Sequence, residues 1–433
     1  MISVEEHLES ILSQIRPVAT VTLPVPQAHG LVTVDDVRSL ADLPRFDNSS
    51  MDGYAVRRAD LEGVTSEEVR LLPVAGDIAA GAGQPRRLEP GSAYRIMTGA
   101  PIPTGADAVV RVEDTDGHPR EAQFRVEPDN GANIRRAGED LKRGDVVVPA
   151  GTKLAAPQIA ALISAGVTEV EVVGPVRVAV LSTGDELVPF GSADGELGAG
   201  QIIDSNGPML EALVREAGCY PVFVGHLADD EGETRKEIKR LAQECDAIIT
   251  TGGVSKGAYD IVKKVLDGEG TMEFVEVAMQ PGKPQGFGVL GKGDKGVPVF
   301  TLPGNPVSTL VSFEVFVRPA LERRGGRRSS EGSAVGYATR SWTCSKDRAT
   351  YTRVRLIRDE TGGYAVEPAG GSGSHLLGGL AMADALAVSP PEVEEVETGA
   401  EVELMLLRPR REIDARLEAE VEELRRSDEE NAD

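Results

Sequence analysis

Residues 299–317, VFTLPGNPVSTLVSFEVFV, decide how the central part of the chain folds. An apolar run from Val299 to Leu302 stops at Pro303-Gly304-Asn305-Pro306, and apolar residues then return at helical spacing. This order predicts a strand, a tight loop and a helix, with Pro306 in a first turn that needs no backbone N–H. The first N–H groups of such a helix point outward at the positive end of its dipole. The loop therefore predicts an anion site, while a simple connector remains the alternative.

Strands and helices alternate on the N-terminal side of this stretch. The segments with strand character are VRVAVLST (176–183), YPVFVGHL (220–227), DAIITTGG (246–253) and VPVFTL (297–302). The segments with helical spacing between them are NGPMLEALVREAG (206–218), DDEGETRKEIKRLAQEC (229–245) and YDIVKKVL (259–266). Alternation of this kind predicts a mostly parallel sheet covered by helices on both faces, which is a doubly wound α/β domain.

The rest of the chain predicts further domains, because 433 residues exceed one ordinary core. Short Val-rich segments broken by Gly and Pro predict β structure on both sides of the α/β domain. RRGGRRSSEG, residues 323–332, is expected to be a linker, and the charged tail a frayed helix passing into disorder. The residues alone predict a helix near 1–20, a β-rich region from about Val32 to Val148, a helix at 151–167 and a second β-rich module from about Ala334 to Arg408.

The composition excludes several classes of protein. A net charge of −24 argues against a nucleic-acid binder, which needs a basic face. The cysteines Cys219, Cys245 and Cys344 are scattered without a CxxC pair, so neither a disulfide framework nor a zinc site is expected. The N-terminal residues form an acidic amphipathic pattern, not a signal peptide, and no apolar run reaches membrane-spanning length. We therefore expect a cytoplasmic protein without membrane insertion.

Four loops expected at the carboxyl edge of the sheet are rich in glycines and polar residues. Ligands of open α/β sheets bind at this edge. Turn geometry explains any one such loop, but four at one edge predict a ligand that carries phosphate. The candidate ligand-binding residues are Ser182, Thr183, Gly184, Asp204, Ser205, Asn206, Gly252, Gly253, Ser255, Pro303, Gly304, Asn305, Pro306 and Ser308.

Carboxylates in the same loops predict a divalent cation. They would repel an anion unless a cation stands between them, and Mg²⁺ is commonly held by one or two carboxylates together with substrate phosphates. The predicted metal ligands are Asp185, Glu186 and Asp260. Each acid can instead serve as a helix N-cap or lie on a solvated face. Lys283 in MQPGKPQGFG adds positive charge on a turn that its glycine and prolines stiffen and that we expect to be exposed.

The combination of motifs resembles the molybdopterin molybdenumtransferase family, the bacterial relatives of the gephyrin E domain. The resemblance extends from about Val4 to Leu407, and the motifs follow the order that is typical of the family. They are FDNSSMDGYAV (46–56), RIMTGAPIPTGADAVV (95–110), NIRRAGEDL (133–141), LSTGDEL (181–187), DSNGPML (204–210), TTGGVSKGAYD (250–260), PGKP (281–284) and LPGNPVS (302–308).

This resemblance implies an elongated homodimer of four subdomains, in which the α/β domain binds molybdopterin. The implied parts are a mixed helical and β N-terminal linking domain (1–45 with 146–174), a β-rich lobe (46–145), the α/β domain (175–322), a C-terminal β-barrel-like domain (332–408) and the charged tail (409–433). A β-rich lobe from the other subunit would close each site. The implied reaction joins molybdate to adenylylated molybdopterin, releases AMP and yields the molybdenum cofactor, with Mg²⁺ assisting. The partners would be small-molecule substrates and a second copy of the chain.

The resemblance also implies roles for individual residues. From the β-rich lobe, Asp52, Thr98 and Asp140 would reach the reacting groups. From the α/β domain, Glu186, Asp260 and either Asp229 or Asp230 would face them. Lys283 would bind molybdate together with Arg353 of YTRVRL and Ser374 of GSGSH.

One departure from the family pattern concerns Gln280. Many relatives read KPGKP, whereas this chain reads QPGKP, so a cation is missing from the expected oxyanion pocket. The loss should weaken molybdate binding by about 1–3 kcal/mol, and Gln280→Lys should tighten it. An alternative function follows, in which a gephyrin-like dimeric adaptor docks a peptide of a membrane or cytoskeletal protein with reduced or lost catalysis. The transferase is favoured by features that an adaptor does not need, namely Asp52, Thr98, Glu186, Asp260 and the PGNP loop.

Overall fold

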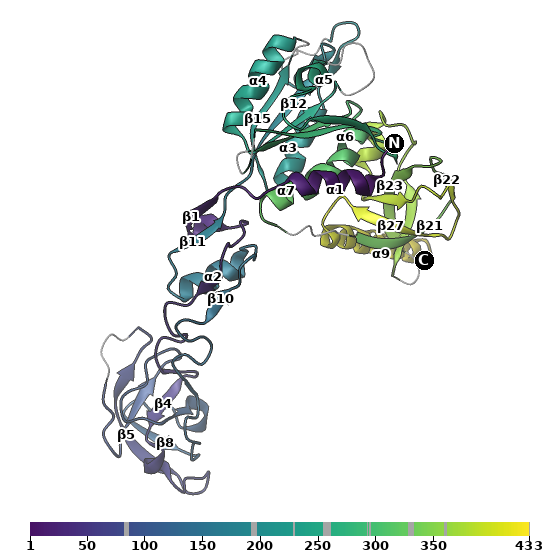
Figure 1. Ribbon diagram of the computed structural model, residues 1–433. Helices are drawn as coiled ribbons and strands as arrows, with labels where there is room; N and C mark the ends of the chain where they lie inside the picture. The colour runs from purple at the N-terminus through teal and green to yellow at the C-terminus, as the bar shows by residue number, and fades with distance from the viewer. Residues whose placement is uncertain are drawn as a thin grey trace. The chain divides into compact units, whose positions relative to one another are not determined.

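The computed structural model describes residues 1–81, 86–191, 197–227, 230–253, 261–291, 293, 296–327, 333–358 and 362–432 (Figure 1). The chain divides into two compact units. The large unit comprises Met1–Val21 and Val173–Asp433, and the small unit comprises Thr22–Val172. Within the described ranges, no helix is both long and apolar enough to cross a membrane.

A six-stranded sheet forms the centre of the large unit, in the order β15-β12-β16-β20-β19-β17. The first four strands in this order run parallel, whereas β19 runs antiparallel to both of its neighbours, β20 and β17. The mostly parallel sheet expected from the sequence is confirmed. The strands are β12 (Arg177–Thr183), β15 (Tyr220–Leu227), β16 (Ala247–Thr251), β17 (Glu273–Glu276), β19 (Pro284–Leu290) and β20 (Val297–Leu302), and a separate short parallel pair joins β13 (Leu187–Val188) to β14 (Ile202–Ile203).

Helices cover both faces of this sheet, as a doubly wound fold requires (Figure 1). Neighbouring residues of β12 show the two sides: Val180 packs in a cluster with Leu210, whereas Leu181 packs in another with Ile238 and Val265. Strands buried on both faces are continuously apolar, which explains the run in 176–183. The helices are α1 (Val4–Gln14), α3 (Asn206–Glu216), α4 (Glu231–Glu244), α5 (Ile261–Leu266), α6 (Pro306–Ser312), the π-helical turn η5 (Phe313–Val317) and α7 (Arg318–Arg324).

The C-terminal part of the large unit is a closed β-barrel, which confirms the barrel-like prediction. The ring runs β23-β24-β21-β27-β25 and closes because β25 also pairs with β23. The barrel strands are β21 (Ser333–Ala338), β23 (Ala349–Arg358), β24 (Tyr364–Pro368), β25 (Ala385–Ser389) and β27 (Glu401–Leu406). Beside them lie β18 (Met279–Gln280), β22 (Trp342–Thr343), β26 (Glu395–Val396) and α8 (Leu377–Ala381).

The charged tail is a helix that packs on the barrel, so the expected frayed end is wrong for its first turns. Helix α9 extends over Arg410–Ala432. Ile413 and Leu417, each 1% exposed, belong to the barrel core. Arg416 donates to the buried carboxylate of Asp384 at 2.7 Å. Composition alone predicted a solvated tail, because the contact depends on two apolar residues and on ion pairs with barrel residues far away in the sequence.

The expected linker begins later than residue 323. Helix α7 continues to Arg324, which is only 5% exposed. Its guanidinium donates to the carbonyl oxygens of Arg16, Asp246 and Gly296. Residues 328–332 lie outside the described ranges.

The small unit is rich in β structure. Its five-stranded sheet has the order β7-β4-β6-β5-β8 and packs around Tyr54 and Phe124. The sheet strands are β4 (Gly53–Val56), β5 (Arg70–Ile78), β6 (Ala93–Ile96), β7 (Ala108–Arg111) and β8 (Glu121–Phe124). Short paired strands are β1 (Thr20–Pro24) with β11 (Glu169–Val173), β2 (Val37–Arg38) with β10 (Val146–Val148), and β3 (Asn48–Ser49) with β9 (Ile134–Arg135). The helical segments are η1 (Val25–Ala28), η2 (Arg58–Leu61), η3 (Val112–Asp114) and α2 (Ala156–Ser164). The finer domain boundaries predicted from the sequence stay predictions.

Candidate active site

Three of the predicted loops meet at one edge of the large sheet. β12, β16 and β20 are adjacent parallel strands, with Ser182 opposite Thr251 and Thr251 opposite Leu302. Their carboxyl ends therefore lie side by side, and they are followed by the loops that begin at Gly184, Gly252 and Pro303. Thr251 links two of the loops, because its Oγ1 donates to the carbonyl of Pro303 at 3.2 Å.

Asn206 ties these strand ends to helix α3. Its Nδ2 donates to Thr251 Oγ1 at 3.0 Å and to the Gly304 carbonyl at 2.7 Å. Its Oδ1 and the Oγ of Ser182 are buried without a hydrogen-bond partner in the described part of the chain. An unpaired buried polar atom costs about 1–3 kcal/mol, so both atoms are candidates for contact with a ligand or an ordered water.

Two of the other predicted acids act as helix caps. Asp204 is buried and accepts from the Gly207 N–H at 3.0 Å, beside the exposed N-cap residue Ser205, whose side chain makes no capping hydrogen bond. Asp230 accepts from the Glu233 N–H at 2.8 Å and starts α4 in the same way. Asp229 lies outside the described residues.

Glycine is required where the loops approach one another. Gly252 has a φ of +90°, and a Cβ there would lie 2.6 Å from the Thr183 carbonyl oxygen. Gly304 lies against Gly252, since a Cβ added at Gly304 would be 3.6 Å from the Cα of Gly252. Gly253 also adopts a positive φ of +70°. Larger side chains would force the loops apart.

The Gly184 turn carries the two carboxylates predicted to hold a metal. Gly184 has a φ of +138°, and the Glu186 carboxylate lies 2.5 Å from the place that a Cβ would take. Asp185 and Glu186 are exposed. Across the described ranges, no group of three His, Cys, Asp or Glu residues is arranged to hold a metal, but these ranges omit Asp260 and Ser255.

The Pro303–Pro306 loop joins the barrel. Asn305 Nδ2 donates to Ser374 Oγ at 2.9 Å, and the Val307 N–H donates to the Ser374 carbonyl at 3.1 Å. The Val307 N–H of α6 therefore points out of the helix, as expected, but it is paired with the barrel loop and is not free for an anion. Ser308, on the same turn, is buried.

Arg353 supports the loop that carries Ser374. The side chain is 5% exposed, and its guanidinium donates to the carbonyls of Gly371, Gly373 and Leu376. These bonds use three of its five N–H donors and hold the loop, so Arg353 positions Ser374. Its predicted contact with molybdate stays a prediction.

The QPGKP turn is not the exposed turn expected from the sequence. Pro281 and Gly282 are buried, and Gln285 Nε2 donates to the Gly282 carbonyl at 2.6 Å. Gln280 forms a strand pair with β23. Lys283 is partly exposed and pairs with Glu276 at 3.0 Å.

In the small unit, the structure brings Asp52 and Thr98 together. The Asp52 carboxylate accepts from the Thr98 N–H at 2.7 Å and from its Oγ1 at 2.9 Å. These two bonds, first the backbone and then the hydroxyl, hold the pKa of Asp52 below its ordinary value. Asp140 is exposed on the neighbouring NIRRAGEDL segment, whose β9 pairs with β3.

Sequence reasoning missed several contacts because the partners are far apart in the chain. The ring Nε2 of His226 lies 2.8 Å from the Gly184 carbonyl oxygen, at the end of β15. Arg348, on the loop before β23, contacts Gln280. No local pattern marks either residue as part of a site. His226 reads as an ordinary strand residue, and Arg348 as part of a charged turn.

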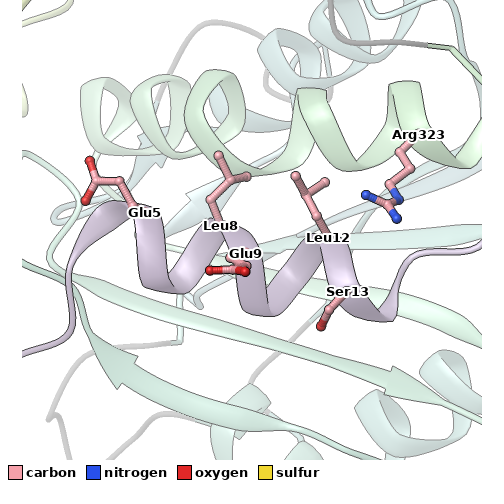
Figure 2. Close-up of a pocket in the computed structure, with 6 residues that line it drawn as sticks. All are labelled: Glu5, Leu8, Glu9, Leu12, Ser13 and Arg323. Carbon is pink, nitrogen blue, oxygen red and sulfur yellow. The ribbon is translucent and has the colours of Figure 1, made fainter.

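A hollow of about 500 Å³ lies elsewhere on the large unit, beside α1 and α7 (Figure 2). Figure 2 shows Leu8 and Leu12 pointing from α1 toward α7. Glu5, Glu9, Ser13 and Arg323 complete its lining. None of the predicted site residues belongs to this lining.

Known proteins resemble the chain over nearly its whole length. Family models match in three segments: "MoeA N-terminal region (domain I and II)" at residues 2–166, "Probable molybdopterin binding domain" at 179–323 and "MoeA C-terminal region (domain IV)" at 335–407. Molybdopterin molybdenumtransferase 2 of Mycobacterium tuberculosis is 42% identical, with 93% of this chain and 99% of that protein covered. Molybdopterin molybdenumtransferase of Haemophilus influenzae is 36% identical, with 93% and 98% covered.

A solved structure of similar fold is the molybdopterin biosynthesis MoeA protein from Pyrococcus horikoshii. It superposes with a TM-score of 0.78 at 31% sequence identity, and the match covers 94% of this chain and 100% of that one.

Proposed function

The chain belongs to the molybdopterin molybdenumtransferase family, and from this membership we propose that it inserts molybdate into adenylylated molybdopterin. The products are AMP and the molybdenum cofactor. The observation that carries the proposal is the 42% identity to a molybdopterin molybdenumtransferase over 93% of this chain. The loops at the edge of the large sheet support it, because their hydroxyls and glycines suit a phosphate-bearing ligand and their carboxylates suit a divalent cation beside it.

The pterin substrate would bind at the carboxyl ends of β12, β16 and β20. Ser182 and Asn206 offer buried polar atoms there, and the glycines at 252 and 304 let the ligand approach the backbone. Ser374 and Lys283 would hold molybdate, with Arg353 fixing the loop of Ser374. Cations and hydroxyls suit an oxyanion because they supply charge-assisted hydrogen bonds.

Mg²⁺ fits the donor set of the Gly184 turn. Asp185 and Glu186 present hard oxygen ligands, and Gly184 leaves the space that the Glu186 carboxylate fills. Asp260, predicted from the sequence, would be the third ligand. When bound there, Mg²⁺ would polarise the phosphoanhydride that is broken as AMP leaves.

Two copies of the chain would form the working enzyme in the cytoplasm. Asp52, Thr98 and Asp140 of one copy would act with the α/β domain of the other, as the family resemblance implies. The relatives named above carry transferase names, and none of them supports the adaptor alternative.

The experiment that tests this function measures AMP released from adenylylated molybdopterin by the purified full-length chain. Release that depends on molybdate and Mg²⁺ is the expected result. Asp260→Ala should abolish release and leave the melting temperature unchanged, because the sequence predicts Asp260 as a metal ligand on an exposed loop. Near wild-type turnover in this variant would refute the assignment of Asp260.

A further inference from the structure

Arg348 lies beside Gln280, the position where the sequence lacks an expected lysine. β18 pairs in parallel with the start of β23, which sets Gln280 opposite Thr350. Arg348 lies on the turn directly before β23, close in sequence to Thr350. Arg348 Nη1 donates to Gln280 Oε1 at 3.4 Å. The barrel therefore delivers a guanidinium to this turn of the α/β domain.

The charge of Arg348 is not neutralised nearby. Lys283 is paired with Glu276 at 3.0 Å. Arg348, in contrast, has no carboxylate within 4.0 Å across the ranges that the structure describes, and its contact at the turn is a neutral amide. An unpaired, partly buried guanidinium beside a paired lysine gives the turn a net positive charge.

We propose that Arg348 is the second cation of the molybdate-binding turn and takes over the charge that Gln280 does not supply. This inference rests on the proposed function, since it assigns the anion as molybdate. The planar guanidinium fork can donate to two oxygens of an oxyanion, which a single ammonium does less well. Gln280 serves as the link: its Oε1 accepts from Arg348, and its Nε2 remains a donor toward the anion.

The proposal changes the expected effect of Gln280→Lys. A lysine at 280 would lose the hydrogen bond and place an ammonium beside the guanidinium. Repulsion between the two cations offsets the added attraction to the anion. In the wild-type background, Gln280→Lys should therefore change the half-saturating molybdate concentration by less than about threefold. In an Arg348→Gln background, the same lysine should restore much of the lost affinity.

The test is a molybdate titration of AMP release with full-length Arg348→Gln, Gln280→Lys and the double variant. Lys346→Gln is the matched control, because it removes a cation from the same loop whose partner is Glu394. We expect Arg348→Gln to raise the half-saturating molybdate concentration about threefold to a hundredfold while kcat changes little. Lys346→Gln should leave both parameters unchanged, and Arg348→Lys should recover part of the affinity.

Two results would overturn the proposal. One is an unchanged molybdate dependence in Arg348→Gln, or a fall in kcat alone, which a merely structural role of Arg348 would give. The other is a fall of tenfold or more in the half-saturating molybdate concentration of Gln280→Lys alone, which would show that the pocket lacked a second cation. This second result decides the question even if Arg348→Gln does not fold. Calorimetric titration of the protein with molybdate separates the proposed role of Arg348 from the proposed transferase function. Binding that depends on Arg348 without AMP release would support the anion site and reject the transferase.

Discussion

Asp52 is the site residue with the best-defined electrostatics. Thr98 holds its carboxylate with two hydrogen bonds, and both favour the charged form. Its pKa is therefore below the ordinary aspartate value. The two bonds contribute their full stability at pH values above the ordinary aspartate pKa, and this contribution is lost as the pH falls through the lowered pKa. At neutral pH Asp52 is a fixed negative charge.

Thr98→Val separates the two contributions. The backbone N–H, which has the larger effect, remains, whereas the hydroxyl is lost. We expect the pKa of Asp52 to rise but to stay below its ordinary value, measured by carbon-13 titration of labelled aspartates. Asp116 is the internal reference, because its pKa is lowered mainly by a hydrogen bond from the Gln123 N–H and does not depend on Thr98. An unmoved Asp52 with a shifted Asp116 would contradict the assignment.

At the scale of the element, helix α1 carries a pH-sensitive contact. His7 is buried against Phe316, with ring centroids 4.8 Å apart in an edge-on geometry. Burial lowers the pKa of His7 to about 4. The unfolded chain binds a proton near the ordinary histidine pKa of about 6.5, so it binds more protons than the folded chain between these values.

Stability should therefore be full above pH 6.5 and fall by up to about 3 kcal/mol as the pH approaches 4. His7→Leu should reduce this fall, because the leucine has no proton to bind. Urea unfolding at pH 7 and pH 4.5 measures the difference for both proteins. An equal loss of stability in the two proteins would assign the acid sensitivity to other groups.

Helix α9 should contribute to the stability of the barrel. Leu417 is buried in the barrel core, so Leu417→Ala should cost about 2–5 kcal/mol. Arg416→Ala should also destabilise, because it removes a partner of the buried Asp384. Thermal melting is the measurement, and Glu418→Ala is the control since Glu418 is exposed. Similar melting of Leu417→Ala and Glu418→Ala would show that α9 is dispensable.

The strand, loop and helix of 299–317 could be predicted because their signals are local. The apolar run and the two prolines decide them without help from the rest of the chain. The contact of the α6 N–H with Ser374 could not be predicted, since its partner lies 67 residues beyond Val307 on a barrel loop. The same holds for Arg348 and Gln280. Roles assigned through motifs depend on contacts that only the folded chain brings together.

At the scale of the whole molecule, the predicted dimer has a direct test. Mixing Asp52→Ala with Asp260→Ala should restore activity, because each heterodimer keeps one composite site without a substitution. Random mixing should give about a quarter of the wild-type number of intact sites. Each variant mixed with itself is the control. No recovery, with heterodimers shown to form, would mean that each copy builds its own site.

The measurement that tests the central claim most directly counts both products in one reaction. Full-length protein is incubated with adenylylated molybdopterin, Mg²⁺ and molybdate, and AMP and molybdenum cofactor are quantified together. We predict equal amounts of the two products and almost no AMP without molybdate. AMP release at the same rate without molybdate, with no cofactor formed, would contradict the claim and show hydrolysis without metal insertion.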